Sequence, residues 1–403
     1  MSGTASVTPG GPGAPSLAVV LGTASGGTAR HAGMLAEGCR RAGLAVLVIG
    51  PTSAQTGFRA GADSWASDVG RPPIPFHPAE ISDRPRPARD LTVLLRLRRL
   101  LRQANPDVAH AHGMRAGAFA ALALSPGAGL GLRRGRRAGA RRRPALVVTV
   151  HNAPPPGRAG RAVFGLLERI CARRADAVLC ASADLADRMR RRGAAGVAEF
   201  DVPALPAPAP SAAQVARARH DLGAAGRPVV LAAGRLAPQK GFDILLAAAA
   251  RWEGRDPVPR LAIAGSGPLA AELTAAAERS GADLVLLGER DDVPALLAAA
   301  DVVAVPSRWE ARALIVQEAL RAGVPVVASR VGGTPGLTGP DAAILVSPED
   351  AGALSEAILS VLDDPARAAR LSEAARFRAS ELPSAVDAVT AVRAVYAGLL
   401  PRC

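Results

Sequence analysis

The sequence predicts an α/β protein made of two Rossmann-like domains that face each other across a cleft. Short β-branched runs alternate with Ala-, Leu- and Arg-rich amphipathic stretches, and this alternation is typical of parallel sheets with helices on both faces. It occurs twice along 403 residues, 49% of them hydrophobic, which is enough chain for two cores. Between the two series, the alternating prolines of Pro203–Pro210 (PALPAPAP) predict a stiff, extended linker at 204–210.

The first domain is predicted over 17–203, after a Gly-, Pro- and Ser-rich tail at 1–16 that we expect to be disordered. Most of its strand candidates end in Gly, Ser or His, as expected where parallel strands open onto a crevice. These candidates are Leu17–Gly22, Ala45–Gly50, Asp107–His112, Ala145–His151 and Ala177–Ser182.

Two stretches of the first domain do not fit a compact sheet. Pro51–Pro87 is rich in Pro, Gly and Ser, and we expect a long loop there that lies over the cleft or is partly disordered. Ser125–Pro144 is a Gly- and Arg-rich insertion between a helix and a strand. A solvated flexible loop and contact with an anionic membrane are both open for this insertion.

The second domain is predicted over 211–383, and a helix at about 384–400 is predicted to cross back onto the first domain. The strand candidates of the second domain are Pro228–Ala233, Arg260–Gly265, Asp283–Gly288, Val302–Pro306, Val324–Ser329 and Ala342–Ser347. In a pair of such domains, ligands usually bind in the cleft between them.

Composition limits the partners. The net charge is +14, so the surface attracts polyanions such as nucleic acid, anionic lipid or phosphorylated substrates. Aromatic residues make up only 3% of the chain and the Arg-rich insertion contains none, so the sequence does not favour nucleic-acid binding. The four cysteines have no CxxC spacing, and no apolar run is long enough to span a bilayer. We expect a cytoplasmic protein, with peripheral contact at the inner membrane face as an open alternative.

The strongest motif is Gly234–Asp243 (GRLAPQKGFD), which follows a predicted strand and opens a helix. The start of a helix offers free N–H groups and a positive dipole end to an anion. Arg235 and Lys240 would neutralise the two charges of a pyrophosphate, and holding such a leaving group as its charge develops lowers a barrier. Lys240 is the one lysine among 49 basic residues, which hints at chemistry that a planar guanidinium would not replace. An ordinary role, with Arg235 paired to an acid and Lys240 in solvent, stays open for this segment alone.

A second motif brings two carboxylates to the end of another strand. Glu310 lies in Pro306–Glu310 (PSRWE), and Glu318 follows eight positions later. One acid can reach the crevice from the loop and the other from the first turns of the next helix. Carboxylates accept hydrogen bonds in pairs, which suits the vicinal hydroxyls of a ribose or hexose.

Together, GRLAPQKGFDILL, AGSGP and PSRWE with a second Glu after seven intervening residues resemble the family-4 retaining glycosyltransferases of the GT-B fold. The match in order and spacing covers roughly 17–50 and 105–380. The resemblance implies that Arg235 and Lys240 contact a donor diphosphate, that Glu318 binds the ribose hydroxyls and that Glu310 binds the transferred sugar. It also implies further donor-binding residues, some near the base: Gly265, Ser266, Gly267, Arg290, Asp292, Val293, Leu314 and Ile315.

The first domain supplies weaker motifs that agree with this resemblance. Gly26 and Gly27 lie in a turn between the first strand and its helix, where glycines allow a backbone to approach a phosphate. His151 ends a predicted strand and resembles the family's active-site histidine, which faces the donor sugar. His110 and His112 have a similar context, and we give them less weight as catalytic groups. The alternatives that stay open are an ordinary tight turn at Gly26 and Gly27 and, for His151, an ordinary polar residue at a strand end.

The sequence departs from the family at two places. Ala311–Ala313 stand where the family usually has glycines, so a requirement for positive φ would strain the alanines or reshape the turn. Gly336 stands where the family usually has Glu. These departures put donor choice and efficiency in doubt, and leave the fold prediction intact.

The resemblance implies transfer of a glycosyl unit from a nucleoside diphosphate sugar to an acceptor hydroxyl, with retained configuration and the departing phosphate as the base. We expect no cofactor beyond this co-substrate and no metal, because the two cations fill the role of a divalent ion. The acceptor, a carbohydrate, lipid or small molecule, is not determined. A catalytically silent sugar-nucleotide-binding scaffold and a sugar-nucleotide epimerase are the alternatives.

Overall fold

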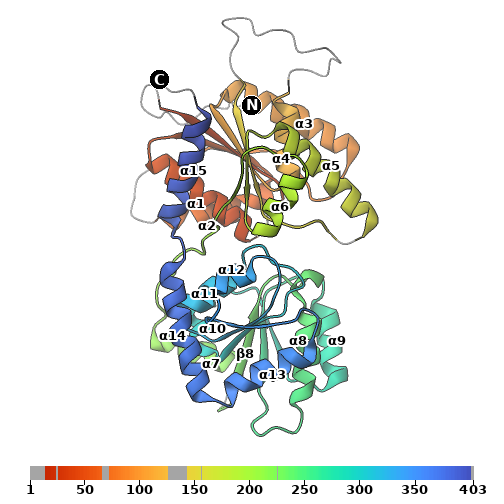
Figure 1. Ribbon diagram of the computed structural model, residues 1–403, viewed down its shortest axis with the longest axis vertical. Coiled ribbons are helices and arrows are strands. Elements are labelled where there is room, and N and C mark those ends of the chain that lie inside the picture. Colours follow the sequence, from red (N-terminus) through yellow and green to blue (C-terminus); the bar gives the residue numbers. More distant parts are fainter. Residues whose placement is uncertain are drawn as a thin grey trace, which may run out of the picture. The chain divides into compact units, whose positions relative to one another are not determined.

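The computed structural model describes residues 14–23, 26–65, 72–125, 143–155, 157–224 and 226–400. The chain folds as two compact units, unit 1 (Met1–Leu205 with Pro383–Cys403) and unit 2 (Pro206–Leu382). Each unit contains one parallel sheet with helices on both faces, as the sequence predicts (Figure 1). Residues 201–211, which include the predicted linker, contain no helix or strand. The cleft between the two domains stays a prediction.

The sheet of unit 1 has the strand order β3-β2-β1-β4-β5-β6-β7. Its central strands are fully buried on both faces, which explains their unbroken apolar runs. The strands are β1 (Ser16–Leu21), β2 (Ala45–Gly50), β3 (Phe76–Pro78), β4 (Val108–His112), β5 (Ala145–Val150), β6 (Ala177–Cys180) and β7 (Val197–Glu199).

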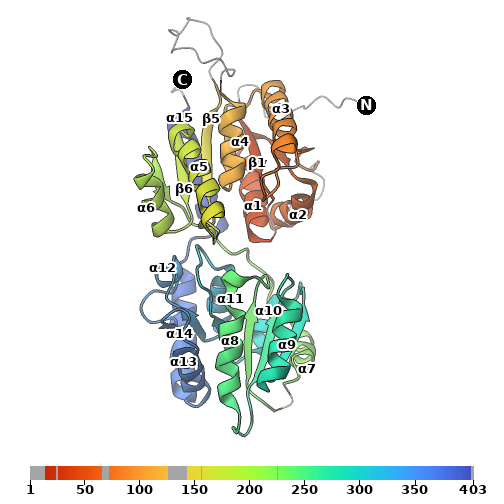
Figure 2. The ribbon, with the colours of Figure 1, turned by 90° about the vertical axis from the view of Figure 1, so that its right-hand side faces the viewer.

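The helices of unit 1 form a layer on each face of this sheet (Figures 1 and 2). On one face α1 packs against α2 and α15, and on the other α4 packs against α3 and α5. The helices are α1 (Gly27–Arg41), α2 (Gln55–Asp63), α3 (Pro87–Ala104), α4 (Met114–Ala123), α5 (Arg158–Arg174), α6 (Ala183–Arg191) and α15 (Ala385–Leu399).

The prediction of a long loop over Pro51–Pro87 is wrong. This segment holds a 3-10 turn (Thr52–Ala54), α2 and β3, with residues 66–71 outside the described ranges. Gly61, one of the glycines that favoured a loop, instead lets α2 cross α1 closely. A Cβ on Gly61 would lie 1.8 Å from the Arg30 carbonyl oxygen, and one on Gly33 of α1 would lie 2.0 Å from that of Phe58. Of the Arg-rich insertion, residues 126–142 lie outside the described part of the chain.

The sheet of unit 2 has the strand order β10-β9-β8-β11-β12-β13. The strands are β8 (Val229–Ala233), β9 (Arg260–Ala264), β10 (Leu284–Gly288), β11 (Val302–Val305), β12 (Val326–Ser329) and β13 (Ile344–Val346). The helices are α7 (Ala212–Asp221), α8 (Phe242–Ala249), α9 (Ala270–Ser280), α10 (Val293–Ala299), α11 (Leu314–Ala322), α12 (Thr334–Thr338), α13 (Ala351–Leu362) and α14 (Pro365–Glu381), with 3-10 turns at Pro238–Lys240 and Ala250–Trp252.

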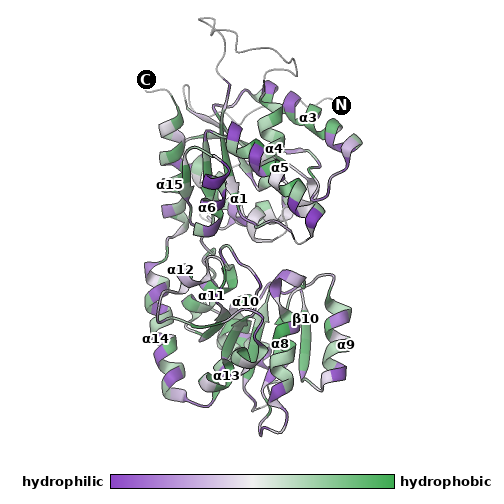
Figure 3. Cartoon of the chain, turned by 45° about the vertical axis from the view of Figure 1, so that its right-hand side comes forward, coloured by the Kyte–Doolittle hydropathy of each residue, from purple (hydrophilic) through white to green (hydrophobic). Residues whose placement is uncertain are grey.

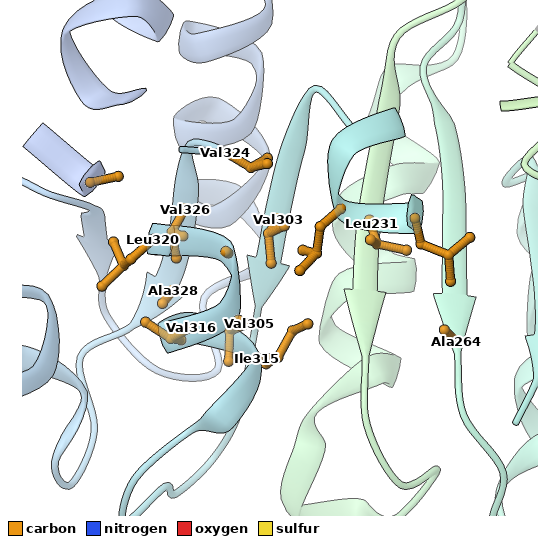
Figure 4. Packing of buried hydrophobic residues seen from close by; sticks show 14 of the residues in the cluster. Leu231, Ala264, Val303, Val305, Ile315, Val316, Leu320, Val324, Val326 and Ala328 are labelled. Atoms are coloured by element: carbon orange, nitrogen blue, oxygen red, sulfur yellow. The ribbon is translucent and has the colours of Figure 1, made fainter. Parts of the chain in front are cut away.

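Alternating side chains of each unit 2 strand enter two different cores. Val303 and Val305 pack with α10, α11 and Leu231 on one face, shown in Figure 4, while Val302 and Ala304 pack with α8 and α13 on the other. Burial on both faces fixes the register of the sheet and so the position of the loops that follow each strand.

The last helix of the chain belongs to unit 1. The α15 helix begins with a capping box, in which the Ser384 hydroxyl accepts from the Asp387 N–H at 3.2 Å and the Asp387 carboxylate accepts from the Ser384 N–H at 2.8 Å. It packs on α1 at Gly38, where a Cβ would lie 2.3 Å from a Val389 methyl group. No helix within the described ranges is both long enough and apolar enough to cross a membrane.

Candidate functional site

Two loops of unit 2, one after β8 and one after β11, are joined by main-chain contacts. The Arg308 N–H donates to the Gln239 carbonyl oxygen at 2.8 Å, and the Gln239 side-chain amide donates to the Trp309 carbonyl oxygen at 2.8 Å. Gly241, at φ 65°, lies so close that a Cβ there would be 2.1 Å from the Pro306 carbonyl oxygen. The GRLAPQKGFD and PSRWE motifs therefore form one cluster at the carboxyl end of the sheet.

Lys240 and Glu310 meet at the centre of this cluster. The Lys240 ammonium donates to Glu310 Oε1 at 2.6 Å, and the Ser307 hydroxyl donates to the same oxygen at 2.7 Å. Glu310 is 6% exposed, whereas the Lys240 side chain is 23% exposed. The ammonium has three donors, so a second anion could bind it without breaking the contact with Glu310.

Arg308 holds the same two loops together from outside. Its guanidinium donates to both carboxylate oxygens of Asp243, at 2.9 and 2.7 Å, and to Glu349 at 2.8 Å. The hydrogen bond from Arg308 lowers the pKa of Asp243. Both residues lie inside motifs that the sequence singles out, but 65 residues separate them and no local pattern indicates that they pair.

Arg235 is exposed on the loop after β8 and forms no ion pair within the described residues. The loop beside it is packed against the turn after β9: the Leu236 N–H donates to the Ser266 carbonyl oxygen at 2.9 Å. A Cβ on Gly265, at φ 142°, would lie 1.9 Å from the Gly234 carbonyl oxygen. Gly265, Ser266 and Gly267 thus pack against the loop that carries Arg235, and their contact with a nucleotide stays a prediction.

Arg290 and Asp292, predicted near a base, are paired with each other and with a third residue. The Arg290 guanidinium contacts Asp292 at 2.7 and 2.6 Å and Asp221 at 2.9 Å. Hydrogen bonds from Arg290 lower the pKa of both aspartates, so at neutral pH all three groups are charged and the group as a whole carries one negative charge. Val293 follows as the first residue of α10.

The remaining predicted donor residues lie on α11. Leu314 begins the helix and Glu318 is half-buried one turn later. Ile315 is 6% exposed and its side chain packs in the core (Figure 4). Burial of the Ile315 side chain leaves its backbone for the predicted donor contact, and that contact stays a prediction.

The alanines of Ala311–Ala313 are not strained. Among the described residues other than glycine, only Asn105 and Glu349 have positive φ, and Ala313 has φ −69°. Ala311 and Ala313 are 5% and 3% exposed. The turn therefore needs no glycine here, and its methyl groups are packed inside.

In unit 1, Gly26 precedes the first turn of α1 at φ 69° and Gly27 is the first residue of that helix. No atom of the described, non-adjacent residues lies within 4 Å of a Cβ on Gly26, so these residues leave the backbone open there. His151 directly follows β5 and is 8% exposed. It lies in a cluster of four histidines that the sequence did not predict: His31, His110, His112 and His151.

The rings of this histidine cluster contact one another. His112 Nδ1 lies 3.2 Å from His151 Nε2, and the rings are stacked. His31, from α1, lies edge-on to both, with centroids 5.9 and 5.6 Å away. Neither ring nitrogen of His31 has a hydrogen-bond partner among the residues that the structure describes, although both are buried.

His110 joins the cluster to the last helix. Its Nδ1 lies 2.6 Å from the Tyr396 hydroxyl on α15, and its Nε2 lies 2.6 Å from the Thr149 hydroxyl on β5. Tyr396 is the single tyrosine of the chain and is 3% exposed. Because a neutral imidazole has one donor and one acceptor nitrogen, these two contacts use both.

Burial keeps these imidazoles uncharged. It lowers the pKa of His151 to about 4 and that of His110 to about 3, and it lowers the pKa values of His31 and His112 well below the ordinary 6.5. In the described ranges, no three His, Cys, Asp or Glu side chains are grouped so as to hold a metal ion. Independence from metal and cofactor stays a prediction.

Two family models match the chain, one in each unit. "Glycosyltransferase Family 4" matches residues 25–198, and "Glycosyl transferases group 1" matches residues 216–378. Among solved structures, Anabaena HepE in complex with UDP-glucose superposes with a TM-score of 0.76 at 21% identity, covering 95% of this chain and 99% of that one. At that identity the likeness concerns the fold.

Curated relatives share shorter segments with the chain. A GDP-mannose-dependent phosphatidylinositol monomannoside mannosyltransferase of Mycolicibacterium smegmatis is 38% identical over 42% of this chain and 47% of its own length. A glycogen synthase of Mycobacterium tuberculosis is 32% identical over 62% of each chain. The chain thus spans about half the length of the first of these relatives.

Proposed function

Because this chain belongs to the family-4 glycosyltransferases of the GT-B fold, we propose that it transfers a glycosyl unit from a nucleoside diphosphate sugar to an acceptor hydroxyl with retention of configuration. The observation that carries the proposal is the grouping of Arg235, Lys240 and Glu310 on interlocked loops. Arg235 is exposed without an ion pair to any described residue, and Lys240 has two further N–H donors beside its contact with Glu310.

In this proposal, Arg235 and Lys240 bind the two phosphates of the donor. Glu310 holds the Lys240 ammonium in place and accepts hydrogen bonds from the sugar hydroxyls, while Glu318 accepts from the ribose. As the bond between the sugar C1 and the phosphate oxygen breaks, the two cations stabilise the charge that develops on the diphosphate.

Retention follows if the acceptor attacks from the face that the diphosphate leaves. The acceptor oxygen forms the new bond to C1, and its proton passes to the departing phosphate oxygen. His151, uncharged because of burial, would present a polar but neutral group to the sugar in this step. No carboxylate nucleophile is required.

The identity of the donor is open, because the relatives point to different nucleotides. The mycobacterial mannosyltransferase uses GDP-mannose, whereas HepE was solved with UDP-glucose. The acceptor is open as well, among carbohydrates, lipids and small molecules. A cytoplasmic location remains part of the proposal.

The test of donor binding is a thermal-shift screen of UDP-, GDP- and ADP-sugars. One class should stabilise the wild type, by about 2.7 kcal/mol at a hundredfold excess over Kd. Arg235→Ala and Lys240→Ala should lose most of that shift. Arg255→Ala, which removes an arginine paired with Asp363 elsewhere in unit 2, should keep it. No stabilisation by any donor would contradict the proposal.

The test of transfer is product analysis with the donor that binds. Proton NMR of the product, or of the sugar from slow donor hydrolysis, should show the anomeric configuration of the donor. An inverted product would contradict front-face substitution. Binding without transfer or hydrolysis would instead support the silent scaffold, whose main argument, the alanines at 311 and 313, is weakened by their unstrained packing.

A further inference from the structure

The helices α3, α4 and α5 carry an unusual share of exposed apolar side chains. Among the described residues, seven large hydrophobic side chains are exposed, and five of them lie on these three helices. They are Leu91 and Leu95 on α3 (both 59% exposed), Leu122 on α4 (41%), and Val163 and Leu166 on α5 (40% and 56%). Isolated exposed apolar residues are ordinary, but a concentration on one layer marks an interaction surface.

These side chains share one face of unit 1. The α3 and α5 helices both pack against α4, and the three lie side by side in Figure 2. Leu91 and Leu95 are four residues apart, and Val163 and Leu166 three apart, so each pair points the same way from its helix. Figure 3 shows hydrophobic and hydrophilic residues mixed along α3 and α5.

The same layer is strongly basic. Nine arginines on α3 and α5 are exposed, and none forms an ion pair within the described residues: Arg89, Arg96, Arg99, Arg102, Arg158, Arg161, Arg169, Arg173 and Arg174. The only two acids of the three helices are already paired with arginines other than these nine. Asp90 accepts from Arg115 at 2.8 Å, and Glu168 is 1% exposed and bound by Arg188 and Arg192.

We propose that the outer face of α3, α4 and α5 docks on the surface of an anionic lipid bilayer. Aliphatic side chains that project from a basic face enter the region between headgroups and acyl chains, while the guanidinium groups remain among the lipid phosphates. The exposed apolar residues are Leu and Val, whereas a nucleic-acid surface needs aromatic side chains for base stacking. The surface uses none of the donor-site residues, so the proposal stands independently of the transferase chemistry.

The experiment is co-sedimentation of the full chain with vesicles of phosphatidylcholine, alone or with phosphatidylglycerol added. The wild type should bind the anionic vesicles, more weakly as salt increases, and bind the neutral ones poorly. The triple variant Leu91→Ser, Leu95→Ser, Leu166→Ser should bind anionic vesicles at least about tenfold more weakly. The matched control Phe377→Ser, Val386→Ser removes the two exposed apolar side chains outside the layer and should bind as the wild type does.

A second pair of variants separates charge at this face from charge in general. Arg96→Gln, Arg99→Gln, Arg169→Gln should lose about tenfold in binding, whereas Arg367→Gln, Arg370→Gln on α14 should not. Unchanged circular dichroism and an unchanged donor-induced thermal shift would show that each variant is folded, and that a failure here is separate from a failure of the proposed function.

Several outcomes would overturn the proposal. Equal binding to neutral and anionic vesicles would remove the charge argument, and full binding by the leucine variant would remove the apolar one. Loss of binding only when the arginines of 126–142 are replaced would assign the lipid contact to that segment. Tight binding of duplex DNA that weakens with the same leucine substitutions would assign the face to nucleic acid.

Discussion

In unit 2 the polar groups of the candidate site are charged and paired across two loops, whereas in unit 1 four imidazoles lie buried, uncharged and in mutual contact. The first arrangement keeps cations at a partly exposed strand end, where an anion can reach them. The second supplies hydrogen-bonding groups without net charge. The two units therefore differ in the electrostatics of their polar groups, which are charged in unit 2 and neutral in unit 1.

The largest expected effect of this difference is on acid stability. The folded-state pKa values of His151 and His110 are about 4 and 3, against 6.5 unfolded, so below pH 6.5 the unfolded chain binds more protons. The free energy of unfolding of unit 1 should therefore fall as pH drops from 6.5 towards 4, by roughly 1.4 kcal/mol per pH unit for each histidine. In unit 2, Asp243 and Asp292 have lowered pKa values, so their stabilisation is lost only below about 3.8.

Denaturant unfolding at pH 7 and pH 5 measures this contrast. Trp65 lies in unit 1, and Trp252 and Trp309 lie in unit 2, so fluorescence of variants that keep the tryptophans of only one unit distinguishes the two transitions. His220→Gln, at an exposed position in unit 2, is the control and should leave both pH profiles unchanged. A loss of unit 2 stability equal to that of unit 1 over this range would contradict the comparison.

A smaller effect should follow from forcing the two loops of unit 2 apart. Gly241→Ala places a methyl group 2.1 Å from the Pro306 carbonyl oxygen at a residue with φ 65°, and should cost unit 2 about 3 kcal/mol. Thermal unfolding of unit 2 measures the cost. Gly336→Ala, where no atom lies within 4 Å, should be neutral or slightly stabilising. Equal stability of the two variants would show that the loops are not locked together.

Removing the cation from the charged pair should cost about 2 kcal/mol. Lys240→Met leaves the Glu310 carboxylate, 6% exposed, with the Ser307 hydroxyl. Adding Glu310→Gln should recover most of the stability, without recovering donor binding. Urea unfolding and the donor thermal shift, measured on the same samples, separate the two roles. Recovery of donor binding in the double variant would mean that Lys240 serves only to neutralise Glu310.

The smallest effect is expected in the neutral cluster. Tyr396→Phe removes one hydrogen bond of buried His110 and should cost about 1 kcal/mol, close to the cost of Thr149→Val at the other ring nitrogen. Burial raises the pKa of Tyr396 well above 10, so phenolate absorbance from this single tyrosine should appear only when unit 1 unfolds. Titration of the phenol near pH 10 in the folded protein would contradict its burial.

The sequence predicts most of the fold because each strand has a local signal, a short β-branched run. These runs begin and end within a few residues of the observed β1, β2, β4 and β8. The sequence does not predict α2 and β3 because Gly57 and Gly61 resemble loop glycines. In the structure they lie in α2, where the missing side chains let this helix cross α1 closely. The sequence misses β7 because that edge strand has three residues and exposes two of them. Composition alone does not separate a glycine that breaks a helix from one that lets two helices touch.

The candidate site likewise has features that the sequence predicts and features that it does not. The sequence singles out Arg235, Lys240 and Glu310 from their place after a strand, and their roles toward a donor stay a prediction. The turn of Gly265–Gly267 packs against the loop that carries Arg235. The contact of Lys240 with Glu310 joins residues 70 apart, and that of His110 with Tyr396 joins residues 286 apart. No local pattern records such pairs. They result from the order in which the strands are arranged in each sheet.

The Lys240 ammonium is the only side-chain amine in the sequence. An amine-selective reagent therefore has a single lysine target, at the centre of the loop cluster. Its rate of modification, followed by mass spectrometry, would report directly on whether that group is covered by a ligand or held by Glu310. Covalent labelling of this one lysine can therefore measure occupancy of the loop cluster without an engineered label.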